Sequence, residues 1–262
     1  MSDIIGISSG AISAYQRALS TTSNNIANVN TDGYSRQVTV LEDSAPKQAA
    51  GMYIGTGVLV NAIKRQYDAF AESNLRNSTS DLSAQTPMVD YTSRVVNIMG
   101  DQTSGLSSAL DSFFSAADAL AADPSSTTQR TSFLNSAGGV ASRFAEVSSQ
   151  LDQVTTETTA ATQGVADQIN ALTTQLAQIN QSMTRSPTLE GQPAQLLDAR
   201  DKALRDLSAL VKVKVSYSAN GMASVSLGTT SSKGVVVDGI TSRPLSVDFT
   251  QGKIEFILDK SG

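Results

Sequence analysis

Near the start of the chain, large apolar side chains recur at a regular spacing. They lie every seven residues, with others at the intervening heptad positions: Ile5, Ile12, Leu19 and Ile26, then Tyr15, Thr22 and Val29. An a/d repeat of this kind predicts an amphipathic helix, from about Ser8 to Val29, that packs against a partner helix. The segment Asn30–Gly33 should end it, because Asn, Asp and Gly tolerate the left-handed backbone found just past helix ends.

Beyond Tyr34 the pattern changes to short alternating segments. Residues 37–41 and 58–63 have the alternation typical of β-strands, and they flank Ser44–Gly57, a stretch punctuated by glycine and proline. We expect this stretch to be flexible. Residues 36–64 as a whole are therefore predicted to form an extended or β linker.

Helical periodicity returns after residue 64. One helix should begin near Tyr67 and be interrupted at Pro87, because proline cannot donate the backbone hydrogen bond of a helix interior. A second helical segment, over residues 88–122, should break or bend around 100–105 and close at Asp123-Pro124.

The longest apolar stripe begins near Gln129 and continues to Met183. A helix of about 50–55 residues would be roughly 80 Å long if continuous, which implies an elongated shape. Gly138-Gly139 and Gly164 are places where a kink is expected to be tolerated. A further helix, rich in charge, is predicted from residue 194 to about 210.

From residue 211 the period switches to two. Two alternating segments surround Ala219–Gly221, a strong hairpin signal, and shorter ones follow at 235–237, 245–249 and 253–258. The expected fold class is mainly α with a C-terminal β region, in which long helices form an elongated bundle and short antiparallel strands follow. The expected domains are 1–35, an N-terminal coiled-coil assembly helix; 36–64, the linker; 65–210, the helical bundle; and 211–262, the start of an incomplete β-rich domain.

Composition excludes several partners and chemistries. Only 16% of residues are charged and the net charge is −5, so the chain should repel nucleic acid and anionic lipid, and no local basic patch compensates. No apolar run is long enough for a secretory signal or a membrane span. The chain contains neither histidine nor cysteine, the usual zinc ligands. The absence of cysteine fits a cytosolic protein and equally a protein exported without disulfides.

Two short motifs resemble functional loops but lack a required group. Gly6–Gly10 matches the G-x-S-x-G pattern of a nucleophile elbow, yet no histidine exists to activate Ser8, so we interpret Ser8 and Ser9 as helix caps. Asn28–Gly33 resembles the start of a calcium loop, but its twelfth position is Thr39 where glutamate is required. We therefore expect no catalytic, cofactor-binding or metal-binding residues.

The predicted helix after residue 194 carries a dense set of charges: Asp198, Arg200, Asp201, Lys202, Arg205 and Asp206. We interpret these side chains as a solvated helical face. Pairs spaced by four residues on such a face contribute little to stability.

Asparagines crowd the end of the first predicted helix. Asn24 and Asn28 lie nearly opposite the apolar stripe, and Asn25 lies to one flank. Asparagine is a poor helix former, so this density has a cost that needs a reason. In one interpretation, Asn28 and Asn30 cap the helix and the others are hydrated. In the other, the amides join neighbouring copies, because they donate and accept without bringing like charges together.

The segment ALSTTSNNIANVNTDGYSR, Ala18–Arg36, closely resembles the amino-terminal signature of the bacterial flagellar axial family, which comprises rod, hook and hook-associated proteins. Further segments are similar to its hook-associated members: 65–70 with 75–80, 106–114 with 123–124, and 196–201. The resemblance covers roughly residues 2–228. It separates the chain from rod and hook proteins, which share the first motif but not the long α-helical domain.

This resemblance implies a structural, non-enzymatic role at the junction between flagellar hook and filament, outside the cell, after unfolded export through the flagellar type III apparatus without a cleaved signal. The implied partners are the hook protein, the second hook–filament junction protein, other copies of the chain in a helical ring, and an export chaperone whose usual binding region would be missing here. The implied subunit-facing residues are Ile5, Ile12, Leu19, Asn24, Asn25, Ile26, Asn28, Asn30, Gly33 and Tyr34.

One departure from the family pattern shapes the expectation. The family's terminal domain pairs amino- and carboxy-terminal helices, whereas this chain ends at Leu258–Gly262 in strand-like sequence. We expect a chain truncated inside the β-rich domain, whose first helix lacks its own partner. Three alternatives remain: another axial protein of the rod or hook; a secreted coiled-coil adhesin or effector, which would leave Asn24–Arg36 unexplained; and a serine-dependent enzyme, which would require Ser8 to react with an acylating probe.

Overall fold

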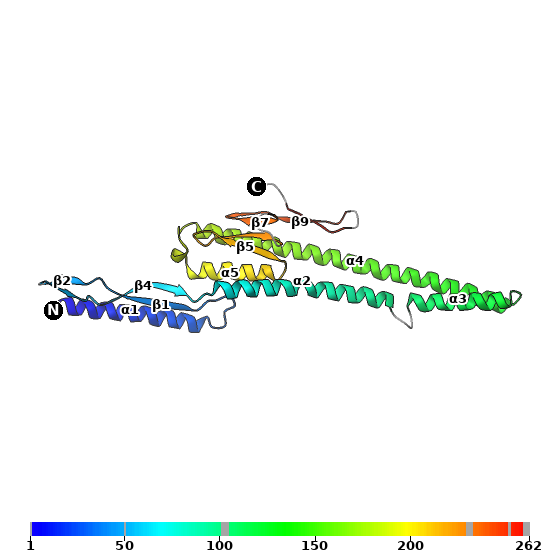
Figure 1. Cartoon of the computed structure of the whole chain (residues 1–262), viewed down its shortest axis with the longest axis horizontal. Coiled ribbons are helices and arrows are strands. Elements are labelled where there is room, and N and C mark those ends of the chain that lie inside the picture. Colours follow the sequence, from blue (N-terminus) through cyan, green and yellow to red (C-terminus); the bar gives the residue numbers. More distant parts are fainter. Residues whose placement is uncertain (1, 50, 101–104, 229–232, 251–252, 259–262) are drawn as a thin grey trace. The chain divides into compact units, whose positions relative to one another are not determined.

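The computed structural model describes residues 2–49, 51–100, 105–228, 233–250 and 253–258 (Figure 1). Its helices are α1 (Ser2–Ala27), α2 (Ala69–Gly100), α3 (Leu106–Ala122), α4 (Thr127–Met183), the short 3₁₀ helix η1 (Leu189–Gly191) and α5 (Ala194–Ser208). Its strands are β1 (Gln37–Asp43), β2 (Lys47–Ala49), β3 (Met52–Ile54), β4 (Val58–Arg65), β5 (Val213–Tyr217), β6 (Ala223–Leu227), β7 (Val235–Asp238), β8 (Thr241–Ser242), β9 (Leu245–Asp248) and β10 (Glu255–Leu258). The prediction of long helices followed by short antiparallel strands is confirmed.

The chain forms two compact units, each built from segments that are distant in sequence. The described residues within 1–80, 169–244 and 258–262 form the first unit, and those within 81–168 and 245–257 form the second. The division into four consecutive domains stays a prediction. Helices α2 and α4 are long enough to contribute residues to both units.

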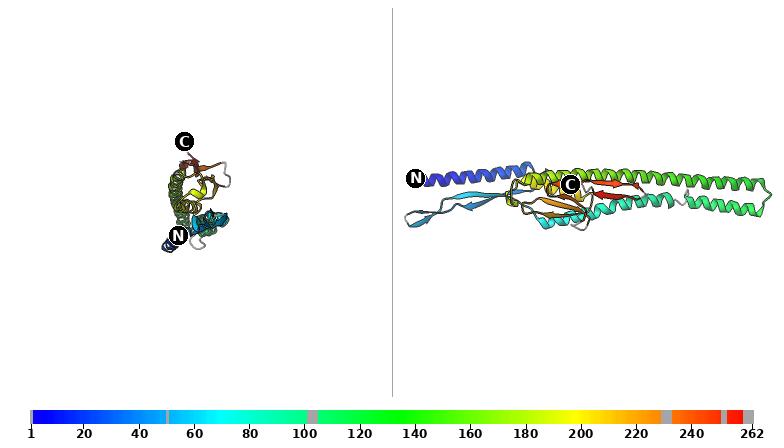
Figure 2. Two further views of the ribbon diagram at one scale, coloured as in Figure 1. Left: turned by 90° about the vertical axis from the view of Figure 1, so that its left-hand side faces the viewer. Right: turned by 90° about the horizontal axis from the view of Figure 1, so that it is seen from above.

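In the first unit, α1 lies along a two-stranded antiparallel ribbon (Figure 2). β1 pairs with β4 from Gln37 opposite Arg65 to Asp43 opposite Val58, with an irregularity between Val40 and Leu41. The chain therefore turns back after α1 and covers one side of that helix with a ribbon.

The stretch Ser44–Gly57 is more ordered than its sequence suggested. β2 and β3 pair there as a short hairpin, with Lys47 opposite Ile54 and Ala49 opposite Met52. This hairpin agrees with the expected extended or β linker. Gly51, at φ +81°, supplies the left-handed residue that a tight hairpin turn needs.

The helix predicted to be interrupted at Pro87 continues through it. α2 begins where Asp68 Oδ1 accepts hydrogen bonds from the backbone N–H groups of Phe70 (2.9 Å) and Ala71 (3.0 Å). Pro87 then removes one N–H from the helix and leaves the carbonyl of Ser83 without its usual donor. The side chains around Pro87 are exposed, so water can reach that carbonyl and the interruption does not break α2.

The second unit contains α3, the N-terminal part of α4 and the C-terminal part of α2. α4 has 57 residues and passes through Gly138, Gly139 and Gly164 without interruption, which makes it about 85 Å long. The rings of Phe113 and Phe133 lie 5.1 Å apart and join α3 to α4. β9 and β10 pair with each other in this unit.

The end of α4 supports a four-stranded antiparallel sheet in the first unit, with the order β5-β6-β7-β8. Asn180 is fully buried, and its amide donates to the carbonyls of Ala223 (2.8 Å) and Gly239 (2.6 Å) and accepts from the N–H of Ala223 (3.0 Å). Met183 and Leu197 pack in the adjoining apolar core. The predicted hairpin turn is present, with Gly221 at φ +85°.

Candidate assembly surface

The large apolar side chains of α1, and that of Val29 two residues beyond its end, point into solvent. Seven of them are 60–74% exposed: Ile4, Ile5, Ile12, Tyr15, Leu19, Ile26 and Val29. At about 100° per residue they fall within roughly one third of the helix circumference, so they form a single stripe, which we call the α1 apolar stripe. An exposed stripe of this length is unusual on a soluble protein, where large apolar patches mark interaction sites.

A different, narrower side of α1 faces the β1–β4 ribbon. Ala14 is 3% exposed and Thr21 is 7% exposed, and a side chain at Gly10 would lie 3.7 Å from the carbonyl oxygen of Val58. These residues are small, so the ribbon can approach the helix closely. α1 thus buries its small residues within the chain and leaves its large apolar residues outside.

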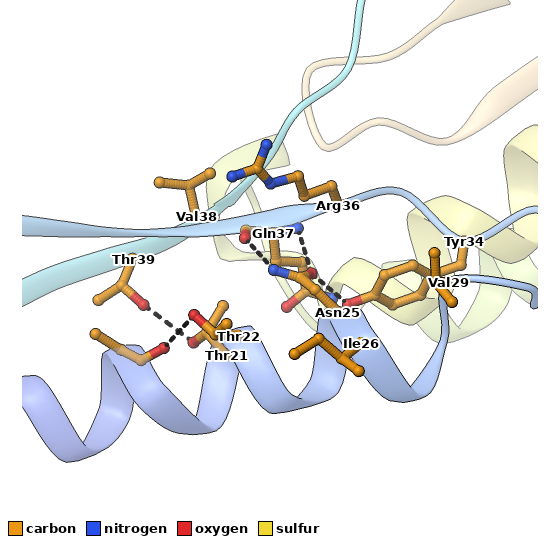
Figure 3. A pocket seen from close by; sticks show the side chains of 11 residues that line it. Thr21, Thr22, Asn25, Ile26, Val29, Tyr34, Arg36, Gln37, Val38 and Thr39 are labelled. Carbon is orange, nitrogen blue, oxygen red and sulfur yellow. Dashed lines mark hydrogen bonds between the residues drawn. The ribbon is translucent and has the colours of Figure 1, made fainter.

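Asn25 joins the end of α1 to the start of β1 (Figure 3). Its side-chain Nδ2 donates to the carbonyl of Gln37 (2.8 Å), and its Oδ1 accepts from the Gln37 N–H (2.9 Å) and from the Tyr34 hydroxyl (2.8 Å). Desolvation, helped by the negative charge of Asp198, raises the pKa of Tyr34, which keeps its hydroxyl protonated as a donor. The Asn25 amide therefore acts as an additional pairing partner for the strand.

A groove of about 600 Å³ lies along this junction between α1 and β1. Thr39 Oγ1 donates to Thr21 Oγ1 (3.0 Å), which in turn donates to the carbonyl of Arg17 (3.0 Å). Ile26 and Val29 of the α1 apolar stripe also line the groove (Figure 3). The stripe therefore continues into a hollow lined by apolar and neutral polar side chains and by one charged residue, Arg36.

The other asparagines of the motif behave differently. Asn28 Nδ2 donates to the carbonyl of Asn24 (3.0 Å), and Asn28 Oδ1 accepts from the Thr31 hydroxyl (3.1 Å), which ends the helix. The side chains of Asn24 and Asn30 are exposed. Gly33 has φ +86°, and a Cβ there would lie 3.1 Å from Lys202 Cβ, so this position requires glycine for its backbone and for space.

The structure therefore divides the predicted subunit-facing residues into two groups. On the exposed side of α1 lie Ile5, Ile12, Leu19, Asn24 and Ile26, with Asn30 exposed just beyond the helix. Packed within the chain lie Asn25, Gly33 and Tyr34, while Asn28 is half-buried and bonds locally at the end of the helix. Helix α1 begins at Ser2, so Ser8 and Ser9 lie inside the helix and the expectation that they cap it is wrong.

The interpretation of the charged helix as a solvated face is wrong for its central residues. Asp198, Arg200 and Asp201 are 8%, 4% and 1% exposed. Asp201 Oδ1 accepts from Arg200 Nε (2.9 Å) and Nη2 (2.6 Å), and Arg200 Nη1 donates to the carbonyl of Gly221 (2.6 Å). These charges are buried because each has a partner of opposite charge or a carbonyl.

Arg65 was not singled out from the sequence and is the missing partner of this cluster. Its Nη2 donates to Asp201 Oδ2 (2.7 Å), and its Nε lies 2.9 Å from Asp198 Oδ1. A helical wheel could have indicated that Asp201 is buried, because Asp201 falls about 40° from Leu197 and 60° from Leu204, two buried leucines. The identity of Arg65, 136 residues away, carries no such local signal.

Among the described residues, no group of three or more acidic side chains is placed to hold a metal ion. Within the same ranges, no helix is both long and apolar enough to cross a membrane.

Two protein-family models match this chain, one near its start and one over most of the rest. The model for the flagellar hook-associated protein FlgK helical domain matches residues 92–258, and the model for flagella basal body rod proteins matches residues 5–34. The chain belongs to the FlgK family of flagellar hook-associated proteins. The rod-protein match coincides with α1 and its following turn.

Curated FlgK-family relatives match along most of the chain. Flagellar hook-associated protein 1 of Salmonella typhimurium is 30% identical over 266 residues, covering 100% of this chain and 48% of the relative. The proteins of the same name from Escherichia coli and Bacillus subtilis are 29% and 33% identical, covering 94% and 80% of this chain and 45% and 43% of their own lengths. The chain therefore spans about half the length of the curated relatives it matches.

A solved structure has the same fold. The flagellar hook junction protein FlgK from Burkholderia pseudomallei superposes with a TM-score of 0.63 at 23% identity, covering 71% of this chain and 33% of that chain.

Proposed function

We propose that the protein is a structural component of the bacterial flagellum at the hook–filament junction, where copies assemble side by side in a helical ring and adapt hook to filament. The observation that carries this proposal is the α1 apolar stripe, which is exposed over its whole length. FlgK-family membership supports the proposed location, and the stripe offers a physical means of assembly.

The energetics favour an assembly role for the stripe. Complete burial of one large aliphatic side chain is worth roughly 1.5–3 kcal/mol, so burying several against neighbouring helices offsets a substantial ordering cost. The heptad spacing suits helix-on-helix packing. The exposed amides of Asn24 and Asn30 add contacts that bring no like charges together.

The partners and location follow from this proposal. We expect the hook protein on one side, the second hook–filament junction protein on the other, and copies of the same chain laterally. The protein would act outside the cell after unfolded export through the flagellar type III apparatus, with an export chaperone before secretion. No enzymatic activity is proposed.

Deletion of the gene tests the location. Cells without the protein should complete hooks, fail to grow filaments and release flagellin into the medium, as seen by electron microscopy and immunoblotting. Normal filaments in such cells would refute the junction role.

Complementation of the deletion tests the stripe. Leu19→Asp places a charge in its middle and should abolish filament growth, while Ser20→Asp, on the next exposed residue outside the stripe, should restore it. The secreted amount and the circular dichroism of both variants should match the parent, because neither side chain is buried within the chain.

The match of residues 5–34 to rod proteins favours one second candidate, a role in the rod. The same deletion separates the two, because loss of a rod component stops assembly before any hook forms. Cells with hooks but no filaments would exclude the rod role, and cells without hooks would support it.

A further inference from the structure

Residues 2–65, which contain α1 and the β1–β4 ribbon, meet α5 along a row of charged side chains. Asp198, Asp201, Lys202 and Arg205 follow one another at spacings of three, one and three residues, which places them on one side of the helix. We call them the α5 charged row. Each contacts a residue outside α5.

Arg65 makes the central contact with this row. It is the last residue of β4, its side chain is 7% exposed, and it reaches both Asp198 (2.9 Å) and Asp201 (2.7 Å). Its Nη2 also donates to Ser35 Oγ (3.1 Å), and its guanidinium lies over the ring of Tyr67 at 5.0 Å. Arg65 is thus held from the ribbon, from the turn after α1 and from α5 at once.

Two further residues of the α5 charged row, Lys202 and Arg205, also contact side chains outside α5. Lys202 pairs with Asp32 in the turn that follows α1, and Gly33 lies against the Lys202 side chain. Arg205 Nη1 lies 3.1 Å from Glu72 Oε1 in the first turn of α2. Arg65 and Asp32 therefore attach residues 2–65 to α5 at two separate points, and the Arg205–Glu72 pair attaches α5 to α2. Together these contacts resist rotation of the ribbon about its short backbone connection to α2.

We propose that Arg65 is a positioning residue which, through the α5 charged row, fixes the direction in which α1 presents its apolar stripe. The proposal rests on the proposed function in one respect, because a fixed direction matters only if α1 joins neighbouring copies. The charge-assisted hydrogen bond from Arg65 to Asp201 is short and directional, whereas apolar packing is not, so it is suited to setting an angle. The ion pair with Asp198 adds attraction at the same point. Asp201 keeps Arg200 as a second partner, so the core of the first unit does not depend on Arg65.

Distance measurements on the whole chain test this role. The chain has no cysteine, so cysteines introduced at the exposed positions Ser20 in α1 and Ala209 after α5 can be spin-labelled without background. Double electron–electron resonance should give one narrow distance distribution for the parent and one roughly twice as wide for Arg65→Gln, because the ribbon moves on its connection. Circular dichroism should remain unchanged.

Three variants separate positioning from general damage. Lys64→Gln removes the same charge one residue earlier, on the other face of β4, where Lys64 is exposed; its distribution should stay narrow. Arg65→Met with Asp198→Asn leaves neither of these two positions charged, so it should fold normally and still show the wide distribution. Arg65→Lys should recover part of the narrowing, because lysine keeps the charge but cannot bridge both aspartates in the same geometry.

A narrow distribution in both Arg65→Gln and the double variant would overturn the positioning role, whatever the motility of the cells. A wide distribution together with normal filaments in Arg65→Gln cells would leave Arg65 as the lock and would refute the need for a fixed α1 in assembly. A wide distribution with shortened or absent filaments supports both.

Discussion

Two helices of the first unit, α1 and α5, distribute their side chains in opposite ways. α1 buries alanine, threonine and an asparagine amide against the ribbon and exposes its large apolar residues. α5 buries its leucines and, beside them, three charged residues. The apolar residues of α5 stabilise the fold of the chain, whereas those of α1 are exposed, as the proposed contacts between chains require.

The comparison also shows two ways of burying polar groups. Asn25 is satisfied by the backbone of Gln37 and by the Tyr34 hydroxyl, all neutral groups. Asp201 is satisfied by Arg65 and Arg200, which are both charged. Neutral pairing costs less desolvation, while ionic pairing is stronger per contact and more damaging when one partner is lost.

The largest expected difference lies between the leucines of the two helices. Leu204 in α5 is 0% exposed, so Leu204→Ala should lower the free energy of unfolding by about 2–5 kcal/mol through lost burial and a cavity. Leu19 in α1 is 68% exposed, so Leu19→Ala should change the free energy of unfolding by no more than about 0.5 kcal/mol. Urea unfolding of the isolated chain measures both, and equal losses would show that Leu19 packs within the chain.

A smaller difference is expected between the adjacent asparagines of α1. Asn25→Ala removes three hydrogen bonds and leaves the Gln37 backbone unpaired, so it should cost about 1–3 kcal/mol and expose the Gln37 amide to hydrogen exchange. Asn24→Ala, on an exposed position, should cost less than about 0.5 kcal/mol.

For assembly we expect Asn24, and not Asn25, to be the position at which substitution acts directly. Asn24→Ala should weaken filament attachment more than stability, as expected for an amide that faces a neighbouring copy. Unchanged motility of that variant would count against an amide contact between subunits, and equal stability losses at both positions would contradict the separate roles of Asn24 and Asn25.

Local patterns predicted much of this fold from the sequence. Periodicity of 3.6 and 2 residues depends on neighbouring side chains, so it located most of the helices and the apolar stripe of α1. Together with the turn residues Ala219–Gly221, it also located the hairpin there. Helix interruption at Pro87 was a wrong prediction, since a single missing donor on an exposed side can be replaced by water.

The contacts that hold α1, β1 and α5 together could not be predicted from local sequence patterns. The partner of Asn25 is a backbone group twelve residues away, and no side-chain pattern identifies it. The charges of α5 were assigned to solvent because charged residues are usually exposed. Their partners include Arg65 and the Gly221 carbonyl, which only the tertiary fold brings near. The sequence therefore drew attention to the asparagines of α1 and the charges of α5, but it did not show which of them are buried within the chain.

The smallest expected effect concerns Asp32 and Lys202, an exposed pair at the edge of the α5 charged row. The hydrogen bond from Lys202, followed by its charge, lowers the pKa of Asp32 below its usual value of 3.8. Because the folded state favours the ionised carboxylate, the pair stabilises the fold above that usual value, and this stabilisation is lost as the pH falls through the lowered pKa.

Asp32→Asn should therefore lower stability slightly at neutral pH and by less under acid conditions, when both chains are followed by urea unfolding from about pH 7 to about pH 2. Asp43→Asn is the matched control, because Asp43 is exposed at the end of β1 and forms no ion pair among the described residues. A gap between Asp32→Asn and the parent that stays constant down to the lowest pH would show that the pair does not stabilise the fold. In that case Arg65, with its buried partners, would alone hold the turn after α1 against α5.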